Sequence, residues 1–170
     1  MDKASEAARD LAIIARQEEL LQFNAFDNTT AWQLGESIKK HCESENLAVT
    51  IEIRLCRETV FFFAMPGTSP NNADWARRKR NTTELQQRSS YAVGLALSEG
   101  ETLETQSGLP MRDYAHHGGG VPIRVRGIGF VGVATISGLP QREDHNIVVR
   151  AMAEFLDMDV LECSLERRPD

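Results

Sequence analysis

The sequence predicts an α/β fold of the α+β kind, a mainly antiparallel sheet flanked by helices. Hydrophobic periodicities follow the order helix, helix, strand, strand, long helix, strand, strand, helix. Strands that are neighbours in the sequence are joined by connections too short for parallel crossovers, which favours antiparallel pairing. A chain of 170 residues suits a single domain over residues 1–170, with flexible ends expected at 1–5 and 164–170.

Composition and charge narrow the range of partners. The chain is 41% hydrophobic and 26% charged, which is typical of a soluble globular protein. Its net charge of -6 argues against binding nucleic acid or an anionic membrane, because both attract a positive surface. No apolar run approaches the ~20 residues of a membrane span, and the N-terminus has no secretory signal pattern. We therefore expect a cytoplasmic protein whose partner is a small molecule or another copy of the chain.

The three cysteines, Cys42, Cys56 and Cys163, are far apart and form no CxxC pair. This spacing predicts neither a disulfide framework nor a structural zinc site. Buried or half-buried free thiols are the expectation.

The first half of the chain carries two helical patterns and then two strands. Residues 4–23 have apolar side chains at helical spacing, and a cluster of capping residues at 27–30 starts a second helix that runs to about residue 45. Residues 47–56 alternate with period two, as a half-buried strand does. Residues 59–65 are more uniformly apolar, which predicts a central strand in a hairpin with the first.

The second half is organised around a glycine-rich stretch. After a loop at 66–72, residues 73–98 predict one long helix. Strands are expected at 121–126 and 128–137, hinged at a glycine. The last helix begins near Pro140, which suits a first helical position, and has acidic residues in its first turn.

Three consecutive glycines, Gly118, Gly119 and Gly120, follow His116 and His117. Glycine loses more backbone entropy on folding than other residues, so three in a row indicate a place where side chains would obstruct a ligand or another backbone. We interpret this segment as the rim of a cavity. The other histidines are expected to be structural, His41 late in a helix and His145 on a helix surface or at an interface.

The densest positive run is residues 77–80, which includes Arg78 and Lys79. At 100° per residue these side chains surround most of a helix, so they do not form one flat patch suited to DNA. Placed early in a helix they oppose its dipole, which favours an acidic partner from a neighbouring subunit or an anionic ligand. The alternative is that they are solvated charges with local ion pairs. Trp75, beside the run, is expected in the core or at an interface.

Several familiar motifs are incomplete. Residues 127–132 match G-x-G-x-x-G, but a strand rather than a helix follows, so no helix N-terminus is available for a dinucleotide. His117 and the three glycines match the HGGG segment of esterases, but the chain has no G-x-S-x-G nucleophile elbow. It also has no HExxH motif, and no metal site is predicted.

Three segments together carry a family resemblance: NADWARRKRNT (72–82), SSYAVGLAL (89–97) and GLPMRDYAHHGGGVPIRVRGIGFVGVATISGLPQREDH (108–145). They resemble the GlcG/HbpS-like family often labelled "haem-degrading", and most closely its short, uncharacterised cytosolic branch. The resemblance covers about residues 11–156. It implies a profilin-like sandwich, assembly from dimers into larger homo-oligomers, and haem as a candidate cofactor.

Two hypotheses follow, and the sequence leaves open whether the protein is an enzyme. In the first, it binds haem or a small carboxylate at a subunit interface, where arginines hold carboxylates through paired hydrogen bonds. The site residues would be Arg78, Lys79, Arg112, Asp113, Tyr114, His116, His117, Gly118, Gly119 and Gly120. In the second, it is a non-catalytic oligomeric protein and these residues make subunit contacts. An acid–base pair of Asp113 and His116 is a further possibility that residue type alone supports.

Overall fold

The computed structural model describes residues 3–165 and contains one five-stranded sheet in the order β1-β4-β5-β2-β3. The strands are β1 (Gln22–Phe23), β2 (Thr50–Leu55), β3 (Glu58–Ala64), β4 (Gly120–Val125) and β5 (Gly129–Ser137). β1 pairs with β4 in parallel and the other pairs are antiparallel, which confirms the predicted α+β class and mainly antiparallel sheet. Residues 1–2 and 166–170, part of the ends expected to be flexible, lie outside the described residues.

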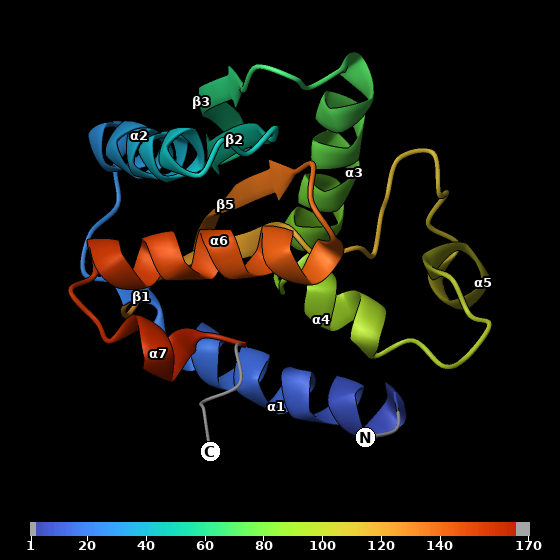
Figure 1. Ribbon diagram of the computed structural model, residues 1–170. Coiled ribbons are helices and arrows are strands. Elements are labelled where there is room, and N and C mark those ends of the chain that lie inside the picture. The colour runs from blue at the N-terminus through green and yellow to red at the C-terminus, as the bar shows by residue number, and fades with distance from the viewer. Residues whose placement is uncertain (1–2, 166–170) are drawn as a thin grey trace.

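Helices cover both faces of the sheet (Figure 1). α2 and α6 pack on one face and α3 on the other, while α1, α4 and α7 close the end near β1 and β4, and α5 stands away from the body. The helices are α1 (Lys3–Leu20), α2 (Asn28–Ser44), α3 (Pro70–Gln86), α4 (Ser90–Leu95), α5 (Leu103–Ser107), α6 (Gln141–Phe155) and α7 (Val160–Cys163). None of the helices in the described part of the chain has the length and apolarity needed to cross a bilayer.

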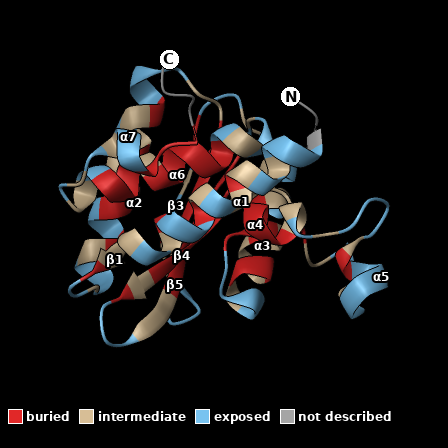
Figure 2. Cartoon of the chain, turned by 90° about the horizontal axis from the view of Figure 1, so that it is seen from below, coloured by how far each residue is buried: buried red, intermediate tan, exposed pale blue. Residues whose placement is uncertain are grey.

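The alternation of side chains along β2 shows how the sheet contacts helices on both of its faces. Ile51 and Ile53 are fully buried in the main core with side chains of α2 and α6. Glu52 and Arg54 point to the opposite face, where they pair with side chains of α3. The buried residues form a continuous interior between the layers, and α5 is largely exposed (Figure 2).

The prediction that residues 59–65 form a central strand is wrong, because β3 lies at the edge of the sheet. Its apolar side chains are covered by a helix instead of by strands on both sides. Phe61 packs over Gly35 of α2 and against the ring of Trp32, and Phe62, on the other face, stays 51% exposed. The apolar run of β3 therefore belongs to an edge strand with one well-buried face, and not to a central strand that is buried on both faces.

The predicted long helix over residues 73–98 is two helices. Gln87 adopts a left-handed conformation, with φ of 52°, and ends α3, and the side chain of Ser89 accepts a hydrogen bond from Ala92 N to start α4. The helix expected over residues 4–23 ends at Leu20, and β1 follows it. A two-residue strand is too short to have a detectable period, so the sequence did not indicate it.

Two smaller expectations are also corrected. Cys42 and Cys163 are buried as expected, but Cys56 is exposed in the β2–β3 turn. His145 is not on a helix surface, because it is 1% exposed between α6 and α1. Its Nε2 lies 2.8 Å from Oε1 of Gln17, whose Nε2 donates to Cys163 O, so His145 must donate the proton in this contact.

Candidate functional site

A pocket of about 300 Å³ lies where α3, the glycine segment and the β5–α6 connection meet, and we call it the lysine pocket. α3 contributes Asn71, Asn72, Trp75 and Lys79 to its wall, and His117 precedes the glycines. The remaining wall is formed by residues 137–139 and Gln141. Both α3 and α6 begin beside this pocket, so their helix dipoles favour negative charge there, although Pro70 has no N–H and Asn72 N already donates to Ser69 O.

The pocket borders a buried ion pair. Lys79 Nζ donates to Asp144 Oδ2 at 2.8 Å, and the two side chains are 4% and 0% exposed. Asp144 also accepts hydrogen bonds from the backbone N–H groups of Gly138 and Leu139, which hold its carboxylate at the start of α6. The carboxylate is thereby fixed, and Lys79 is fixed with it.

Burial works against both charges of this pair. It lowers the pKa of Lys79 below its ordinary value of 10.5, and the nearby Asp144 carboxylate opposes that shift. It likewise raises the pKa of Asp144, against the influence of Lys79 and of the two backbone donors. An amine with a lowered pKa next to a cavity is typical of lysines that act as bases or nucleophiles.

The two adjacent histidines stack on each other, with ring centroids 4.9 Å apart and planes 23° apart. His117 also packs edge-on against Trp75 at 5.0 Å. Burial is the main cause that lowers the pKa of both imidazoles, and the cations Arg78 and Lys79 add to it for His117. Both rings are therefore neutral at pH 7. Nδ1 of His117 is buried and has no hydrogen-bond partner among the described residues, which leaves it for a ligand or a water.

The triple glycine does not form the open rim that the sequence predicts. All three glycines are buried, and a Cβ on each would collide with atoms of the chain itself: the Gln141 carbonyl at Gly118, the Ile136 carbonyl at Gly119 and the Thr83 hydroxyl at Gly120. The obstruction that the glycines avoid is thus the backbone of β5 and α6 and the side of α3. At Gly119 the same Cβ would also lie 3.1 Å from Lys79 Nζ, so this glycine leaves space for the lysine.

The positive run on α3 is neutralised mostly within the chain. Arg77 pairs with Asp74 and Asp113, Lys79 with Asp144, and Arg80 with Glu52. Within residues 3–165, Arg78 is the member of the run that has no carboxylate in ion-pair range. Its guanidinium lies over the Trp75 ring at 4.4 Å, and its Nε donates to Met111 O.

Three predicted site residues lie away from the lysine pocket. Arg112 is 84% exposed and pairs with Asp113, whose carboxylate also holds Arg77. These arginines lower the pKa of Asp113, so it is not suited to act as a base, and the predicted pair of Asp113 with His116 has no support from these contacts. Tyr114 lines a different pocket.

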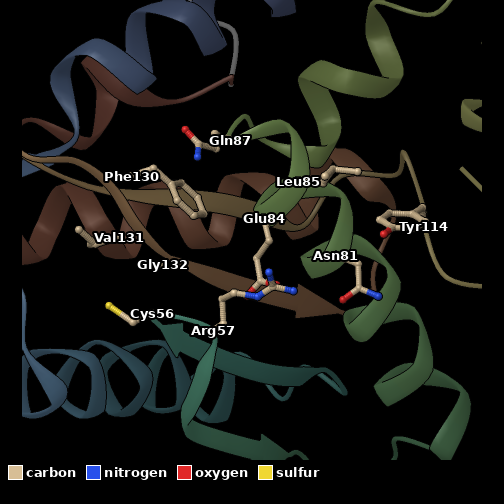
Figure 3. Close-up of a pocket in the computed structure, with 10 residues that line it drawn as sticks. All are labelled: Cys56, Arg57, Asn81, Glu84, Leu85, Gln87, Tyr114, Phe130, Val131 and Gly132. Carbon is tan, nitrogen blue, oxygen red and sulfur yellow. The ribbon is translucent and has the colours of Figure 1, made fainter. Parts of the chain in front are cut away.

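That second pocket, of about 500 Å³, lies between the C-terminal half of α3, the β2–β3 turn and the first residues of β5, and we call it the hairpin groove. Tyr114 and Cys56 lie at opposite ends of it (Figure 3). Between them are apolar side chains, including Phe130 and Leu85, together with Arg57. The groove is larger than the lysine pocket, and the ion pair at its wall, Arg54–Glu84, is more exposed than Lys79–Asp144, at 20% and 11% against 4% and 0%.

Sequence reasoning missed part of the lysine pocket. Asp144 is one of the acidic residues expected in the first turn of the last helix, and Asn72 ends the loop expected at 66–72, but neither was assigned to a site. Asn72 does cap α3, since its Oδ1 accepts from Ser69 N at 2.9 Å, which leaves its Nδ2 donor for other partners. One feature of the sequence could have indicated the pocket. Two helix starts, at Ser69 and Pro140, each follow a strand and carry polar side chains.

The predicted residues do not fit a haem within one chain. The glycine backbone beside His117 is packed against the protein and does not admit a flat ligand, although Nδ1 of His117 has no hydrogen-bond partner among the described residues. A pocket of about 300 Å³ is at the lower limit for small ligands and cannot enclose a tetrapyrrole. The part of the chain that the structure describes also contains no group of three or more His, Cys, Asp or Glu residues that would hold a metal ion.

Comparisons with known proteins agree with this fold. A UPF0303 protein of Azotobacter vinelandii is 51% identical over 159 residues, which are 93% of this chain and 96% of the relative. The crystal structure of Ybr137w superimposes with a TM-score of 0.80 at 28% identity, covering 86% of this chain and 87% of that one. The crystal structure of a PduOC:heme complex shares the fold, with a TM-score of 0.63 at 21% identity over 76% of this chain and 92% of that one.

A family profile described as "Haem degrading protein HbpS-like" matches residues 26–153, which is most of the chain and includes the whole lysine pocket. This match agrees with the resemblance that the α3, α4 and glycine-segment motifs carry. The chain belongs to the HbpS-like family of haem-degrading proteins.

Proposed function

We propose that this protein binds a small carboxylate in the lysine pocket. The observation that carries the proposal is the concentration of donors around a cavity that suits only a small molecule: two helix N-termini and the Asn72 amide, next to the Lys79–Asp144 pair. Trp75 and Leu139 supply the apolar part of the wall. Small-ligand sites commonly combine an apolar wall with a few fixed polar groups.

An unpaired polar atom in the pocket wall supports the same proposal. Nδ1 of His117 is buried without a hydrogen-bond partner among the described residues, and so is the hydroxyl of Thr50 in the neighbouring strand. Thr50 is the cross-strand neighbour of Ser137, which lines the pocket. Buried polar atoms are rarely left unpaired in folded proteins, so a polar ligand or water is the expected partner.

The proposal can be tested by calorimetric titration with three small probes. We expect pyruvate and lactate, which carry a carboxylate, to bind with saturation, and the uncharged ketone acetone to give no heat. Replacing His117 by Ala should weaken binding of the acids by about tenfold, which corresponds to ~1.4 kcal/mol. The matched control is His41→Ala on α2, which should leave the affinity unchanged. Equal affinity in both variants, or the absence of binding by either acid, would contradict the proposal.

Haem is tested with the same proteins. The family description and the haem complex of PduOC make haem the competing ligand. Hemin added to the parent protein should give no saturable Soret shift if the lysine pocket serves a small carboxylate. A saturable shift that disappears in the His116→Ala/His117→Ala double variant would contradict the carboxylate proposal. It would indicate that haem is the ligand and that it is held where copies of the chain meet.

A non-catalytic oligomeric protein is the alternative function. What favours it is Arg78, the one cation of residues 77–80 for which the described residues supply no acidic partner. A neighbouring copy that used Arg78 would be repelled by Arg78→Glu, so the particle mass measured by light scattering should fall. An unchanged mass in Arg78→Glu would remove the support for this alternative.

A further inference from the structure

The charge balance of the lysine pocket points beyond simple anion binding, and the inference below rests on the proposed binding of a small carboxylate. Asp144 already neutralises Lys79 at 2.8 Å, so a bound carboxylate would not find an unpaired ammonium. The helix N-termini and Asn72 are the groups left to hold it. Lys79 is therefore not needed as a charge partner for the ligand, and its amine can instead act as a nucleophile.

Several features prepare the amine for this role. Lys79 is 4% exposed and yet lines the pocket, so a ligand inside it meets the amine away from bulk water. The Asp144 oxygen lies in position to take a proton from Nζ and return it. Gly119 packs directly against the lysine, because a Cβ there would lie 3.1 Å from Nζ, so the glycine lets the amine sit beside the backbone at the edge of the pocket. Desolvated lysines of this kind are the ones that form Schiff bases with carbonyl compounds.

We propose that Lys79 forms a Schiff base with the keto carbon of a small 2-oxo carboxylate bound in the lysine pocket. The Lys79 ammonium first passes one proton to Asp144 Oδ2, and the neutral amine attacks the keto carbon. The carbonyl oxygen becomes a hydroxyl group as the C–N bond forms. Loss of that hydroxyl as water, with the proton held by Asp144, then gives a protonated imine.

The overall change is balanced without an oxidant or a cofactor. One ammonium and one ketone give one iminium and one water. The iminium carries the same positive charge as the ammonium that it replaces, so Asp144 remains its counter-ion. The neutral imidazole of His117, in the same wall, is an acceptor for a proton from the bound substrate once the iminium withdraws electrons from it.

Borohydride trapping tests this step. Sodium borohydride reduces an iminium to a secondary amine, so parent protein incubated with pyruvate and borohydride should gain the mass of one reduced pyruvate group. The chain has four lysines, Lys3, Lys39, Lys40 and Lys79, so peptide mapping can locate the adduct. Lys39 and Lys40 on α2 are internal controls for non-specific labelling, and Lys40 is exposed. We expect the adduct at Lys79 alone.

The outcomes separate this inference from the proposed function. If pyruvate binds in calorimetry but no stable adduct forms, or if the label spreads over Lys39 and Lys40, the Schiff base is wrong and the carboxylate pocket stands. If pyruvate neither binds nor labels, both proposals fail. Lys79→Met combined with Asp144→Leu removes the amine without leaving a lone buried charge and should abolish trapping. Because the mapping is done on the parent protein, the inference stays testable even if this variant does not fold.

Discussion

Two ion pairs of this fold, each with a buried carboxylate, differ in what lies beside them. Lys79–Asp144 borders a cavity, whereas Arg142–Asp10 joins α6 to α1, with Asp10 1% and Arg142 31% exposed, and neither of its residues lines the lysine pocket. Asp10 also accepts a hydrogen bond from the Tyr91 hydroxyl, and burial together with Asp10 raises the pKa of that phenol to about 12. Burial of charge alone therefore does not identify a site. A fixed and buried charge becomes available for chemistry only where a cavity reaches it.

The largest expected effect comes from Lys79→Met. It leaves the Asp144 carboxylate buried without its cation, and breaking a buried pair from one side costs about 3–5 kcal/mol of folding free energy. It should also abolish pyruvate trapping. Urea denaturation followed by circular dichroism measures the first effect, and intact-mass spectrometry the second. Normal stability in this variant would show that the pair is not buried as described.

Gly119→Ala should be next in size. The backbone at Gly119 has a φ of 134°, which side chains rarely adopt, and a Cβ would collide with the Ile136 carbonyl. We expect a loss of about 3 kcal/mol, the sum of backbone strain and overpacking. Gly108→Ala is the matched control, since its φ is also positive, at 67°, but nothing lies within 4 Å of its Cβ position. Equal losses in the two variants would contradict close packing of the glycine segment.

Asp10→Ala probes the pair that has no cavity. It removes the hydrogen bonds from Arg142 and Tyr91, so we expect a loss of about 2–3 kcal/mol in chemical denaturation. Pyruvate affinity and trapping at Lys79 should stay as in the parent protein. A loss of trapping in Asp10→Ala that is as complete as in Lys79→Met would remove the distinction between the two pairs.

At neutral pH His145→Gln should have the smallest effect, and the effect should depend on pH. Burial lowers the pKa of His145 to about 3 in the folded protein, against an ordinary value of 6.5. Between these values the unfolded chain binds a proton that the folded chain does not, so stability falls as the pH falls below 6.5. The variant should lose this slope, at most about 1.4 kcal/mol per pH unit. If the free energy of unfolding falls equally with pH in the variant and the parent from pH 6.5 to pH 4, the predicted contribution of His145 is wrong.

Most of the fold could be predicted from sequence, because long elements have a detectable period. The second hairpin and the last helix are near their predicted bounds, at β4, β5 and α6. The edge position of β3 could not be predicted, since hydrophobicity reports burial of a side chain and not which element covers it. The break at Gln87 depends on one left-handed residue, a conformation that glutamine rarely signals.

The candidate site was predicted only in part. Of the predicted residues, Lys79 and His117 line one pocket, whereas Arg112 and Tyr114 face elsewhere. Proximity in sequence was misleading here, because the backbone turns between residues 112 and 117 direct neighbouring side chains to different surfaces. Asp144 was missed because its role depends on a contact with a residue 65 positions away, which a single sequence does not indicate.

A crystal structure of the protein grown with pyruvate tests the central claim most directly. We expect electron density for one pyruvate in the lysine pocket, with its carboxylate toward the starts of α3 and α6 and its keto carbon next to Lys79 Nζ. Density confined to the hairpin groove, or a lysine pocket filled only by water at saturating pyruvate, would contradict the claim.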